Sequence, residues 1–489
     1  MRRALLGFVL VALALPAPAA ASPFQRSILQ DDAQLLGRGA DVRERTLDEL
    51  KVLGVDVVKM TVSWRELAPG GRRKPGGLNS EDPAAYAGWE RYDAAIASAR
   101  RRQLDVLLQV TGPAPDWASI GRSEPAGTSR PDADEFGRFT RAVGTRYSGS
   151  YQGLPRVSSW SIWNEPNLPR FLLPQRSSDR RRTPLSPAIY RRLYLAAHAG
   201  LSASGHERDT ILFGELLPVG RSSTGVRSSL RPLEFLREMV CLDRRYRPLR
   251  GQAARARGCQ GFRSLPSSGL AYHPYATGGR APTTRPPHPD DATIGQLSRV
   301  VRTLDRLGRR GRIGRGLTLY LTEFGFQTDP PDRLQTPIRR VDDFLAESEY
   351  LAYRNSRVGS WSQYPLVDDA AKGKGLERFA GFQSGLRFAN GQAKPDIYQG
   401  YRLPLFVRRR SRTRIQVFGG ARNGDGGTAS AVVESRLGPA PFAPLANGTV
   451  RLGPRGYFLA SLSVPDAARR QYRISVAGMS SRVTRPTSR

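Results

Sequence analysis

The chain alternates short β-rich runs with amphipathic helical segments from residue 28 to about residue 402, and this alternation limits its fold more than any other feature. Eight β runs alternating with helices over about 375 residues are typical of a (β/α)8 TIM barrel, in which a closed parallel sheet lies inside a ring of helices. We therefore predict the α/β class and a barrel domain over residues 22–402. The expected strands are 28–36, 55–62, 104–110, 160–163, 211–217, 270–275, 317–324 and 358–364.

The pattern changes after Leu403. Short β runs follow one another between Gly, Pro and Asn turns, and no segment has a helical period. This pattern predicts a small C-terminal β-sandwich domain over residues 403–489, whose last residues, 482–489, we expect to form a disordered tail. The domain is rich in arginine, so it could hold the protein on an anionic wall, or it could only pack against the barrel.

The first 21 residues have the organisation of a secretory signal peptide. Arg2 and Arg3 precede an apolar run over residues 4–15, and small residues follow up to Ala21. The apolar run is too short to span a bilayer, and no other run is long and apolar enough. We therefore expect a secreted, extracellular protein with no membrane span after cleavage, in possible association with the cell envelope.

The composition is strongly basic, with a formal net charge of +33, and only six of the 76 basic residues are lysine. Such a surface attracts polyanions, so an anionic cell-envelope polymer is one expected partner. The alternative is that the arginine content reflects coding bias and has no partner. No segment resembles a nucleic-acid-binding module, and we expect no nucleic-acid partner.

The two cysteines, Cys241 and Cys259, are expected to form a disulfide, because the chain is predicted to be exported. The four histidines are His198, His206, His273 and His288, and none makes a ligand pair at helical spacing. We therefore predict neither a metal site nor a cofactor.

Two glutamates lie at the ends of predicted strands. The run over residues 160–163 delivers Asn164 and Glu165 where Pro166 stops the strand, and the run over residues 317–325 carries Glu323. In a parallel barrel the carboxyl ends of the strands carry the chemistry. Two such carboxyl groups can supply the general acid/base and the nucleophile for hydrolysis of a glycosidic bond. The alternative for one strand-end glutamate is a solvated carboxylate or a helix cap.

The motifs Trp163-Asn-Glu-Pro-Asn167 and Thr322-Glu-Phe-Gly325 together resemble those of clan A glycoside hydrolases, nearest in motif to families 5 and 39. The resemblance covers the barrel and does not extend to the C-terminal domain. It implies that Glu165 is the general acid/base, that Glu323 is the nucleophile and that Asn164 contacts the sugar 2-hydroxyl.

Further substrate-binding residues follow from the same resemblance. His273 and Tyr275 match the strand-six pair of the clan, with Tyr275 steadying Glu323, and Trp361 matches the sugar platform of strand eight. Lys59 stands where many relatives place an arginine; it keeps the charge that holds the nucleophile ionised but loses the two-pronged grip of a guanidinium. His273 could equally be a core histidine with satisfied hydrogen bonds.

Aromatic faces stack on sugar rings, so Trp64 and Trp117 are further candidates for substrate binding. Trp160 and Trp163 are expected in the core instead. Three more acidic residues are weaker candidates for contacts with sugar hydroxyls: Glu215, Asp31 and Asp32.

These observations predict a secreted retaining glycoside hydrolase that cleaves O-glycosidic bonds of a poly- or oligosaccharide by double displacement with two glutamates. The alternative is a non-catalytic carbohydrate-binding protein of the cell envelope that kept the barrel and lost the chemistry. The two hypotheses differ in the expected separation of Glu165 and Glu323, which retaining hydrolysis requires to be about 5–5.5 Å.

Overall fold

The computed structural model describes residues 22–121, 125–276, 278–422 and 430–488. The predicted signal peptide, residues 1–21, lies outside the described residues. Within the described part of the chain, no helix combines the length and the apolar character needed to cross a membrane.

Eight parallel strands form a closed barrel in the order β1-β10-β7-β6-β5-β4-β3-β2, which confirms the predicted (β/α)8 fold. A separate parallel pair, β8 (Thr328–Asp329) and β9 (Thr336–Pro337), lies outside the barrel. The barrel strands are β1 (Arg26–Gln30), β2 (Val57–Ser63), β3 (Asp105–Thr111), β4 (Ser159–Ile162), β5 (Thr210–Leu216), β6 (Gly269–Tyr272), β7 (Thr318–Leu321) and β10 (Val358–Gln363).

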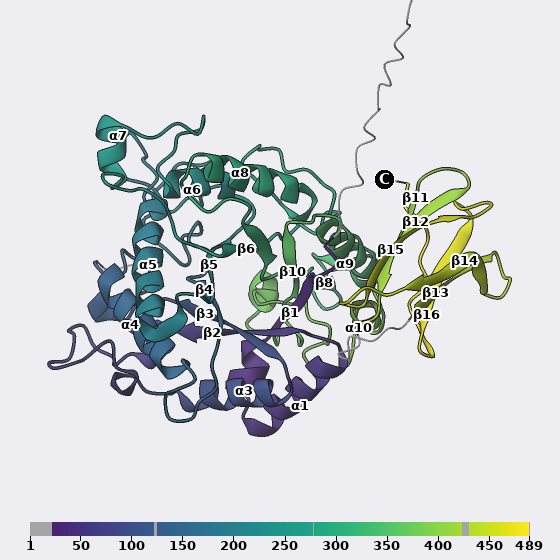
Figure 1. The fold of residues 1–489 in the computed structure, drawn as a ribbon, viewed down its shortest axis with the longest axis horizontal. Coiled ribbons are helices and arrows are strands. Elements are labelled where there is room, and N and C mark those ends of the chain that lie inside the picture. The colour runs from purple at the N-terminus through teal and green to yellow at the C-terminus, as the bar shows by residue number, and fades with distance from the viewer. Residues whose placement is uncertain (1–21, 122–124, 277, 423–429, 489) are drawn as a thin grey trace, which may run out of the picture.

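Helices surround the barrel, as Figure 1 shows. The longer helices are α1 (Ala40–Val52), α3 (Glu90–Arg101), α4 (Ala133–Arg146), α5 (Ser186–Leu201), α6 (Pro232–Met239), α8 (Leu297–Arg309), α9 (Ile338–Tyr353) and α10 (Pro395–Arg402). The short helical segments are α2 (Trp64–Leu67), α7 (Gly251–Ala256), η1 (Ala33–Gly37), η2 (Pro83–Ala85), η3 (Asp116–Ala118), η4 (Ser202–His206), η5 (Ile294–Gln296) and η6 (Gly375–Phe379).

Local sequence signals explain some helix ends but not others. Asp132 caps α4, where its side chain accepts hydrogen bonds from the backbone amides of residues 134 and 135. Gly54, with φ 72°, follows α1 and provides the left-handed residue that ends it. The first residues of α1 carry no such signal: the helix begins at Ala40 after Gly39, which makes no side-chain cap hydrogen bond, and Thr46 is a buried residue inside it.

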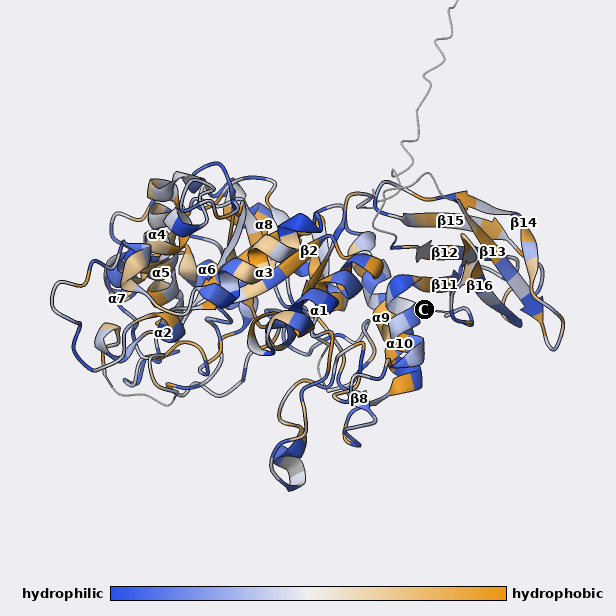
Figure 2. Ribbon diagram, turned by 90° about the horizontal axis from the view of Figure 1, so that it is seen from below, coloured by the Kyte–Doolittle hydropathy of each residue, from blue (hydrophilic) through white to orange (hydrophobic). Residues whose placement is uncertain are grey.

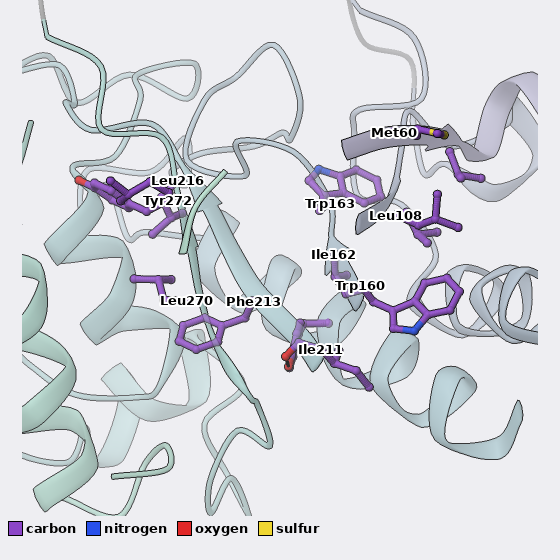
Figure 3. Close-up of a cluster of buried hydrophobic side chains, with 14 of the residues drawn as sticks. Met60, Leu108, Trp160, Ile162, Trp163, Ile211, Phe213, Leu216, Leu270 and Tyr272 are labelled. Atoms are coloured by element: carbon purple, nitrogen blue, oxygen red, sulfur yellow. Dashed lines mark hydrogen bonds between the residues drawn. The ribbon is translucent and has the colours of Figure 1, made fainter. Parts of the chain in front are cut away.

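The hydrophobic core lies between the strands and the surrounding helices. Trp160 projects from β4 and Trp163 follows it, and both pack among apolar side chains of neighbouring strands (Figure 3), as the sequence predicted. A second apolar group is formed by single residues of six barrel strands: Ile28, Val57, Leu107, Leu212, Ala271 and Tyr320. The barrel is therefore a packed core that supports the residues at its rim.

The C-terminal region consists of two antiparallel sheets, as the prediction of a β-sandwich requires. One sheet has the order β11-β12-β15 and the other has the order β14-β13-β16-β17. Figure 2 shows this domain beside α9 and α10. Its strands are β11 (Leu405–Arg409), β12 (Arg414–Gly420), β13 (Ser430–Leu437), β14 (Ala443–Arg451), β15 (Tyr457–Ser463), β16 (Arg470–Val476) and β17 (Met479–Ser480).

The end of the chain is ordered through residue 488, which corrects the expectation of a disordered tail. Thr484 pairs with Tyr472 and Thr487 pairs with Arg408, so the tail continues the backbone pairing of the domain. Arg482 also forms an ion pair with Asp342 on α9. Backbone pairing and this buried charge contact fix a segment that its composition alone would leave free.

A buried charged cluster joins the two domains. The guanidinium of Arg422, which follows β12, forms an ion pair with Glu349 on α9 and donates a hydrogen bond to the carbonyl oxygen of Tyr401. The Tyr457 hydroxyl donates to the same carboxylate over 2.7 Å. We call Arg422, Glu349, Tyr401 and Tyr457 the interdomain cluster.

Candidate active site

A cleft of about 610 Å³ opens at the carboxyl ends of the barrel strands and contains both predicted catalytic glutamates. Two long loops at the mouth, 170–184 and 278–291, contribute Arg170 and Gly278 to its lining. Further lining residues come from the ends of β1, β2, β3 and β10 and from the loop after β10: Gln30, Asp32, Thr61, Gln109, Tyr364, Phe382 and Ser384.

Glu165 is placed by an unusual backbone path after β4. Trp163 and Glu165 have φ values of 70° and 36°, in the left-handed region that non-glycine residues seldom adopt. The amide of Glu165 donates to the carbonyl oxygen of Glu215 over 3.0 Å, which holds this turn against β5. The buried Asn167 side chain adds hydrogen bonds to the backbone of Leu217 and Leu230. Asn167, the second asparagine of the motif, thus holds the turn after β4 against these two backbone segments.

Glu323 follows β7 and faces Glu165 in the same cleft. The Tyr275 hydroxyl donates to Glu323 Oε1 over 2.8 Å, as the resemblance implies. One carboxylate oxygen of Glu165 and one of Glu323 lie within 4.8 Å of each other. Both glutamates are largely buried, at 7% and 9% exposure, so their charges are poorly screened by water.

His273 lies between three carboxylates. Its Nδ1 is 3.0 Å from Glu165 Oε1, and its Nε2 is 2.5 Å from Glu215 Oε2 and 3.8 Å from Glu323 Oε2. Burial by itself would lower the pKa of His273, but these negative charges outweigh burial and raise its pKa to about 10. The ring is therefore an imidazolium at neutral pH, with both nitrogens donating.

Glu215 forms the floor beneath this histidine and does not reach the cleft. A register shift in β5 at Gly214, where a Cβ atom would come within 2.4 Å of Leu270, turns Glu215 into the barrel. Its Oε2 accepts hydrogen bonds from Lys59 Nζ over 3.1 Å and from the Thr322 hydroxyl over 2.7 Å. Although burial opposes ionisation, the charges of Lys59 and His273 lower the pKa of Glu215 well below its usual value.

Lys59 therefore has a different role from the one that the resemblance implies. It forms its ion pair with Glu215, and both side chains are fully buried, whereas the lining of the cleft excludes Lys59. Within the described residues, the cation nearest the predicted nucleophile Glu323 is His273. The prediction that Lys59 holds Glu323 ionised by contact is corrected: Lys59 stabilises the charge under His273.

The pKa of Glu165 is raised. Burial is the main cause, and the neighbouring Glu323 charge adds to it, whereas the hydrogen bond from His273 works against it. The histidine occupies Oε1 of Glu165, so Oε2 can carry a proton toward the cleft. Acid-assisted displacement at a sugar carbon requires one carboxyl group that carries a proton, and the raised pKa of Glu165 suits it to this role.

The three tryptophans predicted to stack on sugars do not line the cleft. Trp64 is fully buried against Phe136 and Phe139, and Trp361 is 2% exposed against Phe324. The indole NH of Trp117 donates to the carbonyl oxygen of Pro69. The sequence prediction is wrong here: Trp64 and Trp361 pack into the apolar core, and the partly buried Trp117 packs edge-on against Trp64.

Smaller aromatic residues line the cleft in their place. Tyr364 and Phe382 form an edge-to-face pair with ring centroids 4.7 Å apart, and Phe382 is 36% exposed. Phe171 and Phe326 also line the cleft. Tyr364 is the last residue of the predicted eighth strand and directly follows β10, whereas Phe382 lies in a loop that carries no sequence signal.

A polar wall completes the cleft. Gln109 donates to Asn164 Oδ1 over 3.1 Å, which orients the amide that the resemblance assigns to a sugar hydroxyl. Asp32 accepts hydrogen bonds from the Gln30 side chain and from the amide of Thr61, and its pKa is raised, mainly by burial.

Of the three weaker acidic candidates only Asp32 lines the cleft. Asp31 accepts hydrogen bonds from backbone amides, and Glu215 lies below the cleft. Gln30 and Gln109 could have been found by the rule that identified Glu165, because both are polar residues near strand ends.

Glu165, His273 and Glu323 also form the set of described residues that could hold a metal ion, since one ligand atom of each lies within 4.8 Å of the others. A metal ligand histidine must offer a nitrogen lone pair. His273 is protonated to about pH 10 and donates both protons to carboxylates. The trio therefore fits an acid/base site better than a metal site.

No family model matches this chain, and no curated protein matches it. Among solved structures, it is similar to Bacteroides uniformis beta-glucuronidase 2 covalently bound to cyclophellitol-6-carboxylate aziridine, at 10% identity and a TM-score of 0.45. A second similar structure is a glycosyl hydrolase family 2 member from Bacteroides cellulosilyticus, at 10% identity and a TM-score of 0.37. Each alignment covers 96% of this chain but only 48% and 46% of the other, so this chain spans about half the length of either protein.

Proposed function

We propose that the protein is a retaining glycoside hydrolase that cleaves O-glycosidic bonds of a poly- or oligosaccharide. The observation that carries the proposal is the pair Glu165 and Glu323, from β4 and β7, whose carboxylate oxygens lie within 4.8 Å of each other in one cleft. Retaining enzymes separate their two carboxyl groups by about 5–5.5 Å, whereas inverting enzymes leave about 6.5–9.5 Å for a water molecule.

In the first step, a Glu323 oxygen attacks the anomeric carbon, and the bond from that carbon to the glycosidic oxygen breaks. Glu165 gives its proton to the departing oxygen, which leaves as an alcohol, and the sugar remains as an ester of Glu323. In the second step, the ionised Glu165 takes a proton from water, whose oxygen attacks the anomeric carbon. The ester bond breaks, the sugar leaves with its original anomeric configuration, and both glutamates return to their starting states.

The surrounding groups support this division of roles. The Tyr275 hydroxyl donates to one oxygen of Glu323. Nε2 of His273 lies 3.8 Å from Glu323 Oε2, and Glu215, itself paired with Lys59, holds the histidine ring in place. Asn164, oriented by Gln109, is placed for a hydrogen bond to the sugar that strengthens as positive charge develops on the ring.

Substitution of each glutamate by glutamine tests the proposal. On a panel of polysaccharides and aryl glycosides, Glu323→Gln is expected to lose on the order of 10⁴-fold or more in kcat on every active substrate. Glu165→Gln should lose about 10²–10⁴-fold on polysaccharides. Its loss should be smaller on aryl glycosides with acidic leaving groups, because such groups leave without a proton.

Glu207→Gln, an exposed substitution of the same kind, is the matched control and should keep wild-type activity. NMR of the first-formed product should show the retained anomer. Full activity of either cleft variant, or an inverted first product, would contradict the proposal. Glycan binding without release of reducing ends would instead support the non-catalytic carbohydrate-binding alternative.

Three finer assignments belong to the same proposal. The two motifs support membership of clan A, near families 5 and 39, on the residues 163–167 and 322–325. The signal-peptide pattern of residues 1–21 supports secretion, with the barrel over 22–402 and the β-sandwich domain from 403 onward. The net charge of +33 supports an anionic cell-envelope polymer as a partner.

A further inference from the structure

A surface hollow of about 470 Å³ is lined almost entirely by arginine. We call it the arginine hollow. Its lining residues are Arg244, Arg245, Tyr246, Arg306, Arg309 and Arg310. The five arginines are exposed, and within the described part of the chain none of them takes part in an ion pair. Five cations around one concave surface repel one another, and an anion placed between them relieves this repulsion.

The acidic residues beside the hollow are already engaged with other arginines. Asp243 pairs with Arg247 over 2.9 Å. Asp290 and Asp305 pair with Arg237 and Arg357 over 2.7 and 2.8 Å. The hollow therefore keeps its full positive charge.

The loop that carries half of the hollow is held in one conformation before any ligand binds. The Asp243 carboxylate accepts hydrogen bonds from the amides of Arg245 and Arg247, which folds the turn over residues 242–248. The Tyr246 hydroxyl is 3.2 Å from the Thr303 hydroxyl on α8, so the turn is fastened to the helix that supplies the other arginines. The disulfide between Cys241 and Cys259, predicted from the sequence, closes the segment that contains this turn. A preformed site loses little conformational entropy on binding.

The hollow lies at the end of the barrel opposite the cleft. The chain passes from the 242–248 turn to the start of β6 at Gly269, and from the end of α8 to the start of β7 at Thr318. These are the amino ends of the strands, whereas Glu165 and Glu323 follow carboxyl ends. A ligand in the hollow therefore leaves the cleft open.

We propose that the arginine hollow binds an anionic polysaccharide through its sulfate or carboxylate groups and holds the protein on it while the cleft remains free. Guanidinium groups match such oxyanions with paired hydrogen bonds, and arginine is the residue best suited to this contact. Single-stranded nucleic acid fits less well, because it binds by stacking its bases on aromatic faces. The single ring of the hollow, Tyr246, has the guanidiniums of Arg237 and Arg306 at 5.6 and 5.1 Å from its centroid. The choice of a polysaccharide as the polyanion rests on the proposed glycosidase function.

The test compares two triple variants that remove the same charge. The hollow variant carries Arg245→Gln, Arg306→Gln and Arg309→Gln and keeps the other two arginines of the hollow. The control variant carries Arg410→Gln, Arg412→Gln and Arg469→Gln, at three exposed arginines of the C-terminal domain, which is the other basic candidate for anchoring. Binding of the full-length protein to fluorescent dextran sulfate and to polygalacturonate is measured at fixed salt, with neutral dextran as the blank. The hollow variant should bind at least about tenfold more weakly than the wild type, and the control should change by less than about twofold.

The two probes distinguish sulfate from carboxylate as the preferred group, and tighter binding of either supports the proposal. Both variants should keep the wild-type kcat/KM on a small aryl glycoside, which separates this result from the fate of the proposed function. Equal weakening in the two variants would assign binding to general charge and overturn the proposal. Tighter binding of single-stranded DNA of equal charge, or inhibition of aryl-glycoside hydrolysis by the bound polysaccharide, would also overturn it.

Discussion

The cleft floor and the interdomain cluster both bury charges, but they balance them differently. In the cleft and directly beneath it, the three carboxylates of Glu165, Glu215 and Glu323 share the two cations Lys59 and His273. In the interdomain cluster, the carboxylate of Glu349 meets the guanidinium of Arg422 one to one. The carbonyl oxygen of Tyr401 accepts from this guanidinium, and the Tyr457 hydroxyl donates to the carboxylate.

The two clusters have different roles because their buried charges are balanced differently. With more carboxylates than cations in a buried site, one acid is favoured to keep its proton, and the raised pKa of Glu165 identifies it. A matched pair leaves no proton to exchange: the charge of Glu349 raises the pKa of Arg422 against the effect of burial, so its guanidinium stays charged. The first arrangement suits proton transfer, and the second fixes the position of one domain against the other.

The largest expected effect comes from making the cleft cluster balanced. Glu215→Gln leaves Lys59 without its ion-pair partner and should lower the free energy of unfolding by roughly 3–5 kcal/mol, the usual cost of breaking a buried pair. It also frees His273 to interact more strongly with Glu165, so the pKa of Glu165 should fall. The alkaline limb of the kcat profile should then move to lower pH. Urea unfolding and kcat profiles measure both changes, and an unmoved alkaline limb in the folded variant would contradict the charge-balance account.

A smaller effect, confined to stability, is expected when the matched pair is broken. Arg422→Met leaves Glu349 buried with the Tyr457 hydroxyl alone and should lower the free energy of unfolding by about 3 kcal/mol. The double variant Arg422→Met with Glu349→Leu should recover much of this loss, because it removes the unpaired charge. At temperatures where all variants are folded, kcat/KM should equal that of the wild type. A parallel loss of activity would show that the cluster acts on the cleft.

A third effect depends on pH and changes gradually rather than in one step. The folded pKa of His273 is about 10, against about 6.5 for an unfolded histidine, so its stabilisation is fully present below about pH 6.5 and is lost as pH rises toward 10. This group alone should lower the free energy of unfolding by about 1.4 kcal/mol per pH unit across that window. Urea unfolding between about pH 7 and about pH 9 should show this decline in the wild type and in Arg422→Met, and a shallower one in His273→Gln. Equal slopes in all three proteins would place the pKa of His273 outside the window.

Much of the fold and part of the site could be predicted from the sequence. The alternation of β and helical periods determined the barrel, because burial of strands on both faces and of helices on one face leaves few other solutions. Glu165, Asn164 and Glu323 were found because polar residues at strand ends seldom serve packing. The tryptophans were misassigned, since the sequence around an aromatic residue has the same pattern whether its side chain faces the cleft or the core.

The sequence by itself determined the strands, their order along the chain and the residues at their carboxyl ends, because these depend on local periodicity and on the chemistry of single side chains. Tertiary structure alone decided that Lys59 lies under Glu215, that His273 connects three acids, and that Phe382 and Tyr364 replace tryptophan at the cleft. It also brought the five arginines of the hollow together. Charges separated by more than a hundred residues, such as Glu165 and His273, influence one another's protonation only after the barrel has closed and removed the water between them.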